Sequence, residues 1–488
     1  MKTASVSFSG KLLRVHAALA CSVMVLSVAG CGGGSDSTPS AVTLGQAPAA
    51  AVGPMLRPTP APLAETDAVN VWNQNAISAL SNGATAATPG LGLPPPVAFI
   101  HLAIVQGAVY DAVNSIKGGH DPYIAGLKAP TSASQSAAAA TAAHHVLISL
   151  VDQVPTASVG LKDTIKARLD TDYQNSLDEI SAGQLKDQGV EVGAQAATAM
   201  LFNRVSDGRY GAPGFPFANP AGPGQWRPMP GNDPNAWVRS VRPFTLPSSD
   251  FFQTSGPSLV TSDQYTLEFN EVKALGRASG SMRSPEQTSL AYWSGGHPLP
   301  LLYGGLRQVA AAKGLTVTEQ ARLYAMTSMS GADSLINCWA EKARWGFWRP
   351  TTAIQLAADD GNPNTTPDPA WTSLLTLPPY ADEPSGANCV YSGVMNGAKA
   401  FFGSDAAEFD LTSPGVGPVG GVPTGSTRHY SEFSHVVRDI IEARILGGLH
   451  FRRADVNGAL LGEAVADYVD KNFFSCGPPG QCGQEEGH

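Results

Sequence analysis

Two basic side chains stand seven residues apart in the segment 341–350, which reads Glu-Lys-Ala-Arg-Trp-Gly-Phe-Trp-Arg-Pro. Seven residues span about two helical turns, so Lys342 and Arg349 would lie on one face of a helix. The flanking aromatic residues indicate a buried setting, where two cations on one face are costly unless an anion joins them. Taken alone, the segment fits a solvated basic face equally well. Arg344 points elsewhere and is expected to be structural.

A helix start that suits an anion follows in the segment 383–389, Glu-Pro-Ser-Gly-Ala-Asn-Cys. Ser385 and Gly386 precede an apolar helix that is predicted to start near Val390. The first N–H groups of a helix have no intrahelical acceptor, and together with the positive end of the helix dipole they form an anion site. Simple capping of the helix by Ser385 or Asn388 is the alternative, and the segment alone does not decide between them.

A histidine beyond a helix end marks the third segment, 442–452. Arg444 and His450 are six residues apart and would face different ways on a continuous helix. The pair Gly447-Gly448 is a typical helix end, so both side chains can turn toward one point. A lone histidine is more often a satisfied core residue than a ligand, but this one follows an arginine and a helix end.

Helical periodicity, with apolar residues at i, i+3 and i+4, dominates the elements that must position these segments. Helices are predicted over 64–80, 97–116, 132–154, 157–173, 182–202, 262–277, 285–293, 301–313, 318–347, 391–402, 428–446 and 455–472. A Gly/Pro-rich stretch, 207–257, contains Trp226 and Trp237 and is expected to pack over the helices. Strand-like alternation is scarce and no internal repeat is found. The prediction is therefore an all-α fold, one large helical-bundle domain with long Gly/Pro-rich loops.

The composition excludes several classes of protein. The 488 residues include 31 Lys and Arg against 40 Asp and Glu, a formal net charge of −9, and no basic domain stands out, so nucleic-acid binding is not expected. Charged residues make up 15% and hydrophobic residues 43%, which argues against a disordered chain. The sequence contains no G-x-S-x-G, H-E-x-x-H, C-x-x-C or P-loop motif.

The N-terminus has the features of a lipoprotein signal. Basic residues precede an apolar run from Ala17 to Gly30, which is too short to span a bilayer and fits a secretory signal. The run ends in Leu-Ser-Val-Ala-Gly-Cys, which resembles the bacterial lipobox, where the cysteine (here Cys31) is lipidated. An ordinary signal peptide with an incidental cysteine is the alternative. We predict a lipoprotein-type signal peptide over 1–30, a flexible tether over 31–63, and an exported lipoprotein of the bacterial cell envelope, periplasm-facing or in the outer membrane.

No later segment offers 18 consecutive apolar residues, so membrane contact is expected only through the lipid anchor. An envelope compartment permits disulfide bonds. Cys476 and Cys482 flank Gly-Pro-Pro-Gly-Gln in an irregular tail, 474–488, where a local bridge is predicted. Cys338 and Cys389 lie beside the first two anion-handling segments. A bridge between them is a further hypothesis if those segments meet, and two buried unpaired cysteines are the alternative.

The three segments, in this order, resemble the three-part site of the vanadium-dependent haloperoxidases and the related type 2 phosphatidic-acid phosphatases. That pattern is K-x6-R-P, then P-S-G-H, then S-R-x5-H. Lys342, Arg349 and Pro350 match the first part, and Arg444 and His450 match the spacing of the third. Further stretches are similar to the soluble bacterial haloperoxidase-like branch: 101–116, 226–228, 241–244, 283–288, 332–354 and 447–466. The resemblance covers about 65–473, and a helical domain of this family is placed at 64–473.

This resemblance implies an α-helical fold with a site for a tetrahedral oxyanion. His450 would bind vanadium through a ring nitrogen or, in the phosphatase version, attack phosphorus. The implied cofactor is vanadate, with phosphate as a competitor or substrate analogue. The implied partners are hydrogen peroxide and a halide, or a small phosphomonoester. The groups that would hold the oxyanion oxygens are Lys342, Arg349, Ser385, the Gly386 N–H and Arg444.

The sequence departs from the family pattern at the site itself. Ala387 stands where the family has a second histidine that transfers protons, and Ala443 replaces the serine before the arginine. Ala454 occupies the position where an aspartate often orients the metal-binding histidine, and Asp455 comes one residue later. Three polar side chains remain as candidates to assist: Asn388, His429 and Asp455. His429 is expected at a helix start, away from the anion.

Three functions fit these residues. The principal hypothesis is a vanadate-dependent haloperoxidase that oxidises halide with hydrogen peroxide. The second is a phosphatase of the same architecture that acts on a soluble phosphomonoester through a histidine nucleophile. The third is a degenerate envelope lipoprotein that only binds an oxyanion. Loss of a general acid typically removes about 10²–10⁴-fold of rate, so Ala387 weakens both enzymatic hypotheses.

Overall fold

The computed structural model describes residues 67–212, 214–228, 233–413 and 426–476. Within these residues the regular structure consists of thirteen α-helices, two short 3₁₀ helices and one two-stranded antiparallel sheet. The predicted all-α class is therefore confirmed. The predicted signal peptide and tether, with Cys31, lie outside the described residues.

The helices and strands fall into three consecutive groups. The first contains α1 (Ala68–Ser81), α2 (Pro95–Lys117), α3 (Gln135–Gln153), α4 (Val159–Asp178), α5 (Gln184–Asn203) and the 3₁₀ helix η2 (Ala236–Ser240). The second contains α6 (Asp263–Leu275), α7 (Pro285–Trp293), α8 (Pro298–Lys313), α9 (Val317–Trp345), α10 (Pro350–Gln355) and the 3₁₀ helix η3 (Ala357–Asp359). The third contains α11 (Gly386–Phe402), β1 (Ala406–Ser413), β2 (Ser426–Glu432), α12 (Phe433–Leu446) and α13 (Arg452–Asn472).

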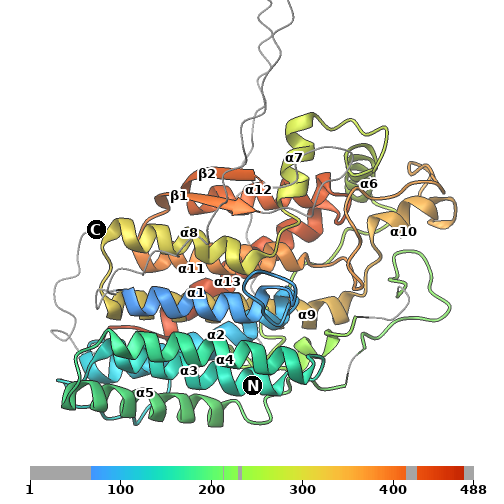
Figure 1. Ribbon diagram of the computed structural model, residues 1–488. Coiled ribbons are helices and arrows are strands. Elements are labelled where there is room, and N and C mark those ends of the chain that lie inside the picture. The colour runs from blue at the N-terminus through green and yellow to red at the C-terminus, as the bar shows by residue number, and fades with distance from the viewer. Residues whose placement is uncertain (1–66, 213, 229–232, 414–425, 477–488) are drawn as a thin grey trace, which may run out of the picture. The chain divides into compact units, whose positions relative to one another are not determined.

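Helix α9 lies at the centre of the packing. It contacts α2, α11 and α13, so it joins the N-terminal helices, blue to green in Figure 1, to the C-terminal helices, orange to red. A capping box between Thr316 and Glu319 fixes its start. Gly346, in the left-handed conformation with φ 50°, fixes its end. The chain therefore leaves α9 in a sharp turn directly after the first predicted anion-handling residues.

Helix α2 is the apolar core of the N-terminal group, with buried residues on all of its faces. Among the residues that the structure describes, it alone is long and apolar enough to cross a membrane. Its most apolar stretch is completely buried within the protein, which is the environment of a core helix.

Close packing of α13 on α11 depends on glycine. A Cβ atom added at Gly458 would lie 2.5 Å from the carbonyl oxygen of Ser385, and one at Gly462 would lie 2.4 Å from that of Cys389. Both distances are shorter than any relaxed contact, so only glycine lets the two helices approach this closely. The consequence is that the N-terminal half of α13 rests against the start of α11.

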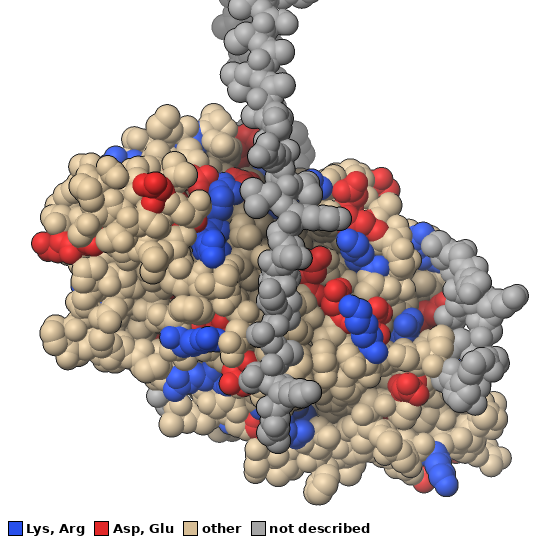
Figure 2. Space-filling model, turned by 180° about the vertical axis from the view of Figure 1, so that it is seen from behind, with Lys and Arg blue, Asp and Glu red and all other residues tan. Residues whose placement is uncertain are grey.

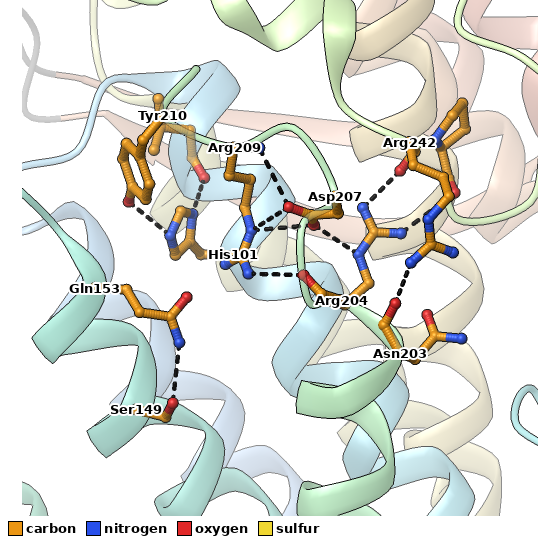
Figure 3. Close-up of polar contacts among 11 residues, drawn as sticks. His101, Ser149, Gln153, Asn203, Arg204, Asp207, Arg209, Tyr210 and Arg242 are labelled. Carbon is orange, nitrogen blue, oxygen red and sulfur yellow. Dashed lines mark hydrogen bonds and ion pairs between the residues drawn. The ribbon is translucent and has the colours of Figure 1, made fainter.

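The chain after α5 is held by buried arginine contacts (Figure 3). Arg204 Nε donates to Asp207 Oδ2 at 2.9 Å, and Arg209 Nε donates to the same carboxylate at 3.0 and 3.1 Å. His101 on α2 bonds to the Tyr210 hydroxyl at 2.8 Å. Burial lowers the pKa of His101 to about 3, so this histidine is a neutral structural group.

The Gly/Pro-rich stretch 207–257 packs on the helices, as predicted. Trp226, Trp237 and Phe244 are buried. Asp333 of α9 accepts hydrogen bonds from the backbone N–H groups of Phe244 and Thr245, both at 2.7 Å. These bonds fix the middle of the stretch to the central helix.

The predicted helix over 428–446 is wrong at its start. Residues 426–432 form strand β2, which pairs with β1 so that His429 lies opposite Asp410 and Tyr430 opposite Phe409. Strand β1 alternates exposed and buried residues, and its buried face packs on α8 beside Gly305. The pairing is a contact between distant segments, so local periodicity did not reveal it. The short helix α10 was also not predicted.

Acidic and basic side chains are interspersed over the face of the molecule in Figure 2, with no large area of one sign.

We predict that Gly462→Ala destabilises the fold by about 1–3 kcal/mol, because the added methyl group overpacks the contact between α11 and α13. The matched control is Gly304→Ala in the middle of α8, where nothing lies within 4 Å of the new Cβ and the helix gains about 0.5–1 kcal/mol. Urea unfolding of both variants measures the difference. Equal midpoints for the two variants would contradict the close helix contact.

Candidate active site

The predicted site residues meet where α9 ends, where α11 begins and where the chain turns between α12 and α13. Arg349 Nη1 lies 3.3 Å from His450 Nε2, and the two side chains are almost completely buried. Ser385 is also buried, and Lys342 reaches the backbone of the preceding residue, Pro384. The first and third segments thus touch directly, and the second lies against the first.

Arg349 arrives by a different route from the predicted one. Helix α9 ends at Trp345, so Arg349 does not share a helix face with Lys342. Instead it is the N-cap residue of α10, after the turn at Gly346. The turn at Gly346, and not a shared helix face, therefore brings the two cations to the same site.

The buried ammonium group of Lys342 points at the chain before α11. Its Nζ donates to the carbonyl oxygens of Ala381 at 2.8 Å, Asp382 at 3.1 Å and Pro384. The ring of Tyr380 lies 5.0 Å from the same nitrogen. Burial lowers the pKa of Lys342, and the nearby positive charge of Arg349 lowers it further.

Arg349 links the same chain segment to the turn before α13. Its Nε donates to the Tyr380 carbonyl oxygen at 2.8 Å and its Nη1 to the Leu449 carbonyl oxygen at 2.8 Å. The guanidinium carbon lies 5.0 Å from the centre of the Tyr380 ring. These contacts place the cation directly beside the imidazole of His450.

His450 stands between a cation and a carboxylate. Its Nδ1 lies 2.8 Å from Asp382 Oδ1, although the ring N–H is not aligned for a hydrogen bond to that oxygen. Burial lowers the pKa of His450 well below its ordinary value, and the charges of Arg349 and Lys342 lower it further. The imidazole is therefore neutral at pH 7, and its Nε2 faces Arg349.

The first turn of α11 has unused N–H groups. Within the described residues the backbone N–H groups of Gly386, Ala387 and Asn388 have no hydrogen-bond acceptor. The Asn388 side chain donates to Asp455 Oδ1 at 2.7 Å and to Ser385 Oγ at 3.3 Å. Asp455 thus reaches the helix N-terminus and not the ring of His450.

Arg444 is the cation without a partner. No hydrogen bond or ion pair within the described ranges involves its half-buried side chain, and its Nε is buried. Its charge nevertheless lowers the pKa of His450, which places it near the imidazole. A guanidinium group in this state provides donors for an anion.

The carboxyl groups of the site are disposed toward the neutral form. Burial raises the pKa of Asp382 well above its ordinary value, that of Glu383 to about 7 and that of Asp455 to about 8. Three cations therefore face little opposing charge at neutral pH. No cluster of three His, Cys, Asp or Glu side chains in the described part of the chain suits a metal cation. The site is electrostatically suited to an anion.

His429 is not part of this site, although it was a candidate to assist there. It lies on the exposed strand β2, and not at a helix start, with its side chain 65% exposed. Its Nε2 lies 2.7 Å from Glu408 and its Nδ1 2.9 Å from Asp410. Hydrogen bonds from Asp410 and then Glu408 raise its pKa. Because β2 pairs with β1, this histidine lies on the exposed sheet and not at the candidate site.

Sequence reasoning missed Asp382 and Tyr380. Asp382 faces His450 and so takes the position beside the ring that the family pattern gives to an aspartate after the histidine. The signal was present, because the run Tyr-Ala-Asp-Glu directly precedes Pro384-Ser385-Gly386. Two adjacent acidic residues need cationic partners when they are buried, so their position next to a predicted anion site indicated that they contact its cations.

The cysteines give a mixed result. Cys338 and Cys389 are buried free thiols, so the hypothesised bridge is not formed, and Cys338 Sγ donates to the Pro384 carbonyl oxygen at 3.6 Å. Cys476 is disulfide-bonded. Cys482 lies outside the described residues, so the pairing of Cys476 with Cys482 stays a prediction.

We predict that Arg444→Gln lowers the affinity for sulfate, a tetrahedral oxyanion of constant charge, by about 10- to 100-fold, since charge-assisted hydrogen bonds contribute about 1.5–3 kcal/mol. The control is Arg438→Gln, because Arg438 lies on the same helix, α12, but is 62% exposed and paired with Glu432. Isothermal titration calorimetry measures both. Equal losses in the two variants would contradict an anion site at Arg444.

Part of the chain matches a known family. Residues 322–476 match the family model of the VCPO second helical-bundle domain, and this range contains all the residues assigned above to the site. Vanadium chloroperoxidase of Curvularia inaequalis is 22% identical over 499 residues, and the alignment covers 81% of this chain and 81% of that protein.

Two solved structures have a similar fold over most of their length. A bacterial vanadium-dependent iodoperoxidase superposes with a TM-score of 0.63 at 21% identity, covering 85% of this chain and 97% of that one. A holo-type bacterial vanadium-dependent chloroperoxidase superposes with a TM-score of 0.62 at 18% identity, covering 82% and 95%. The chain thus has the helical fold of these vanadium-dependent haloperoxidases, and its residues 322–476 match the family model of the VCPO second helical-bundle domain.

Proposed function

We propose that this protein binds vanadate and acts as a haloperoxidase-like enzyme that oxidises halide with hydrogen peroxide. The observation that carries the proposal is the buried, neutral His450, with Nε2 3.3 Å from Arg349 and Nδ1 2.8 Å from Asp382. A neutral imidazole held in this way can bond to the central atom of an oxyanion. Vanadium dependence in the names of the similar chloroperoxidase and iodoperoxidase supports the choice of vanadate.

The donor set of the site fits a tetrahedral oxyanion. The free guanidinium of Arg444 and the unused N–H groups of Gly386 and Ala387 would hold its oxygens. Arg349 can add the second hydrogen of Nη2, because that nitrogen makes one bond, of 3.4 Å, to Ala381. When bound, vanadate supplies the centre that activates hydrogen peroxide toward halide.

The protein's own residues prepare the imidazole and exclude water from it. Asp382 faces the ring from one side, and the side chain of His450 is only 1% exposed. No side chain at Ala387 transfers a proton, and Asn388 donates a hydrogen bond without being able to give up a proton near neutral pH. We therefore expect oxyanion binding to be retained and turnover to be slow.

A phosphomonoester phosphatase of the same architecture is the second candidate. The same neutral His450 beside Arg349 suits a nucleophile for phosphorus, with the cations stabilising the equatorial oxygens. The missing acid at Ala387 costs this reaction more when the leaving group is poor. The third candidate is an envelope lipoprotein that would use the same donors to bind an oxyanion and would catalyse no reaction.

We further propose that the protein is exported and anchored in the bacterial cell envelope through Cys31. The support is the basic start, the short apolar run and the lipobox-like sequence of residues 1–31. Labelling with a radioactive fatty acid tests this proposal, since Cys31→Ser should abolish incorporation of the label.

Orthovanadate should switch on bromination of an organic dye by hydrogen peroxide and bromide, and it should inhibit hydrolysis of p-nitrophenyl phosphate. His450→Ala should abolish both activities, because no other described imidazole lies beside Arg349. His429→Ala is the control and should retain them, since that residue is exposed on β2. Restoring the family residue with Ala387→His should raise turnover about 10-fold or more on the general-acid scale.

Each outcome of these assays has a distinct meaning. Hydrolysis of p-nitrophenyl phosphate in the absence of vanadate, with no bromination when vanadate is added, would favour the phosphatase. Binding of vanadate without either activity would favour the binding-only hypothesis. A parent protein that turns over briskly and gains nothing from Ala387→His would have another proton donor, and Asp455 would be the first residue to test.

Sulfate affinity should fall as the pH rises through about 8. The pKa of Asp455 is raised to about 8, so its carboxyl group is neutral below that pH and becomes a negative charge beside Ser385 and Asn388 above it. In Asp455→Asn the fall near pH 8 should disappear, while a decline near pH 7, where Glu383 titrates, should remain. Calorimetric titration at several pH values checks both, and an equal decline in the variant would assign the effect to another group.

A further inference from the structure

The contacts of Lys342 account for all the hydrogens of its ammonium group. A protonated lysine has three donors and no acceptor. Nζ donates to the carbonyl oxygens of Ala381, Asp382 and Pro384, which are three separate acceptors within one short segment. The residue is completely buried, so no water competes for these donors. A fourth bond to an anion would require one of the three to break.

The segment that Lys342 holds carries other groups of the site. Asp382 faces His450 Nδ1 at 2.8 Å, and Ser385 begins the helix whose free N–H groups suit an anion. The backbone N–H of Asp382 donates to the Phe347 carbonyl at 2.9 Å. The carbonyl groups, in contrast, depend on Lys342 and on the guanidinium of Arg349. Removal of the ammonium group would leave the Asp382 carbonyl oxygen without a donor among the described residues, whereas Ala381 would keep a 3.4 Å bond from Arg349 and Pro384 a 3.6 Å bond from the Cys338 thiol.

The other two cations of the site are placed differently. The side chain of Arg444 makes no hydrogen bond to the described residues, and its Nε is buried and unpartnered. Arg349 touches His450 Nε2 at 3.3 Å and keeps a hydrogen of Nη2 free. An anion arriving at the imidazole therefore meets these two arginines with donors available, whereas Lys342 has none to offer.

We propose that Lys342 is a positioning residue that clamps residues 381–384 and so holds Asp382 against His450, while Arg444 and the α11 N-terminus bind the oxyanion directly. This inference rests on the proposed oxyanion site and refines its ligand set. It reassigns the lysine of the first motif from a ligand to a structural donor. The charge of Lys342 still favours an anion nearby, but no N–H group contacts it.

Hydrogen exchange without any anion isolates the clamp. Lys342→Met should reduce protection of the Asp382 and Ser385 amides at least about 10-fold, because the segment loses three hydrogen bonds, while amides of α2 stay within about twofold of the wild type. The matched control is Lys399→Met, an exposed lysine on α11, which should leave all of these amides unchanged. A uniform loss of protection across α2 and the segment would indicate only global destabilisation and would overturn the proposal. Unchanged protection would do the same.

A crystal structure of the wild type with orthovanadate tests the ligand set without any substitution. Lys342 Nζ should keep its three carbonyl partners and lie more than about 4 Å from every anion oxygen, with Arg444 at about 3 Å. Contact of Nζ with the anion at about 3 Å would overturn the proposal. If no oxyanion binds, the proposed function fails, while the exchange experiment still decides whether Lys342 is a clamp.

Discussion

Hydrogen bonds from two buried cations to backbone carbonyl groups hold the candidate site together. Lys342 bonds to three carbonyl oxygens of 381–384, and Arg349 bonds to those of Tyr380 and Leu449. A buried cation is tolerated only with such partners, and a buried irregular segment needs donors for its carbonyl groups. The cations supply the donors that the carbonyl groups need, and the carbonyl groups supply the acceptors that the cations need. The end of α9, the chain before α11 and the turn before α13 are joined as a result.

This arrangement sets the charge of the site. With the lysine and one arginine committed to the backbone, Arg444 is left as the open cation. Burial raises the pKa of Asp455 to about 8 and that of Glu383 to about 7, so the carboxyl groups oppose an anion only weakly at neutral pH. The neutral state of His450 follows from burial and from the nearby cations. The same cations that make the imidazole a free base would attract the oxyanion to it.

Helix packing determines which polar groups can serve this site. Gly458 lets α13 rest on the first turn of α11, so Asp455 bonds to Asn388 and not to the histidine five residues before it. The carboxyl group that faces His450 comes instead from Asp382, whose Oδ1 lies 2.8 Å from Nδ1 of the ring. His429, a candidate in the sequence, is carried away on the exposed strand β2.

The sequence by itself determined the helical class and located the three segments that meet at the candidate site, because helical periodicity, helix ends at glycine and motif spacing are local properties. It located α7 at residues 285–293 and the convergence of Arg349 with His450, which lie 3.3 Å apart. It could not determine that Lys342 donates its three ammonium hydrogens to backbone carbonyl groups. Nor could it determine that Asp382 faces His450 or that residues 426–432 pair with β1. Each of these depends on a contact between segments far apart in the chain. Only the tertiary structure decides them, since a side chain's partners are set by what packs against it and not by its neighbours in sequence.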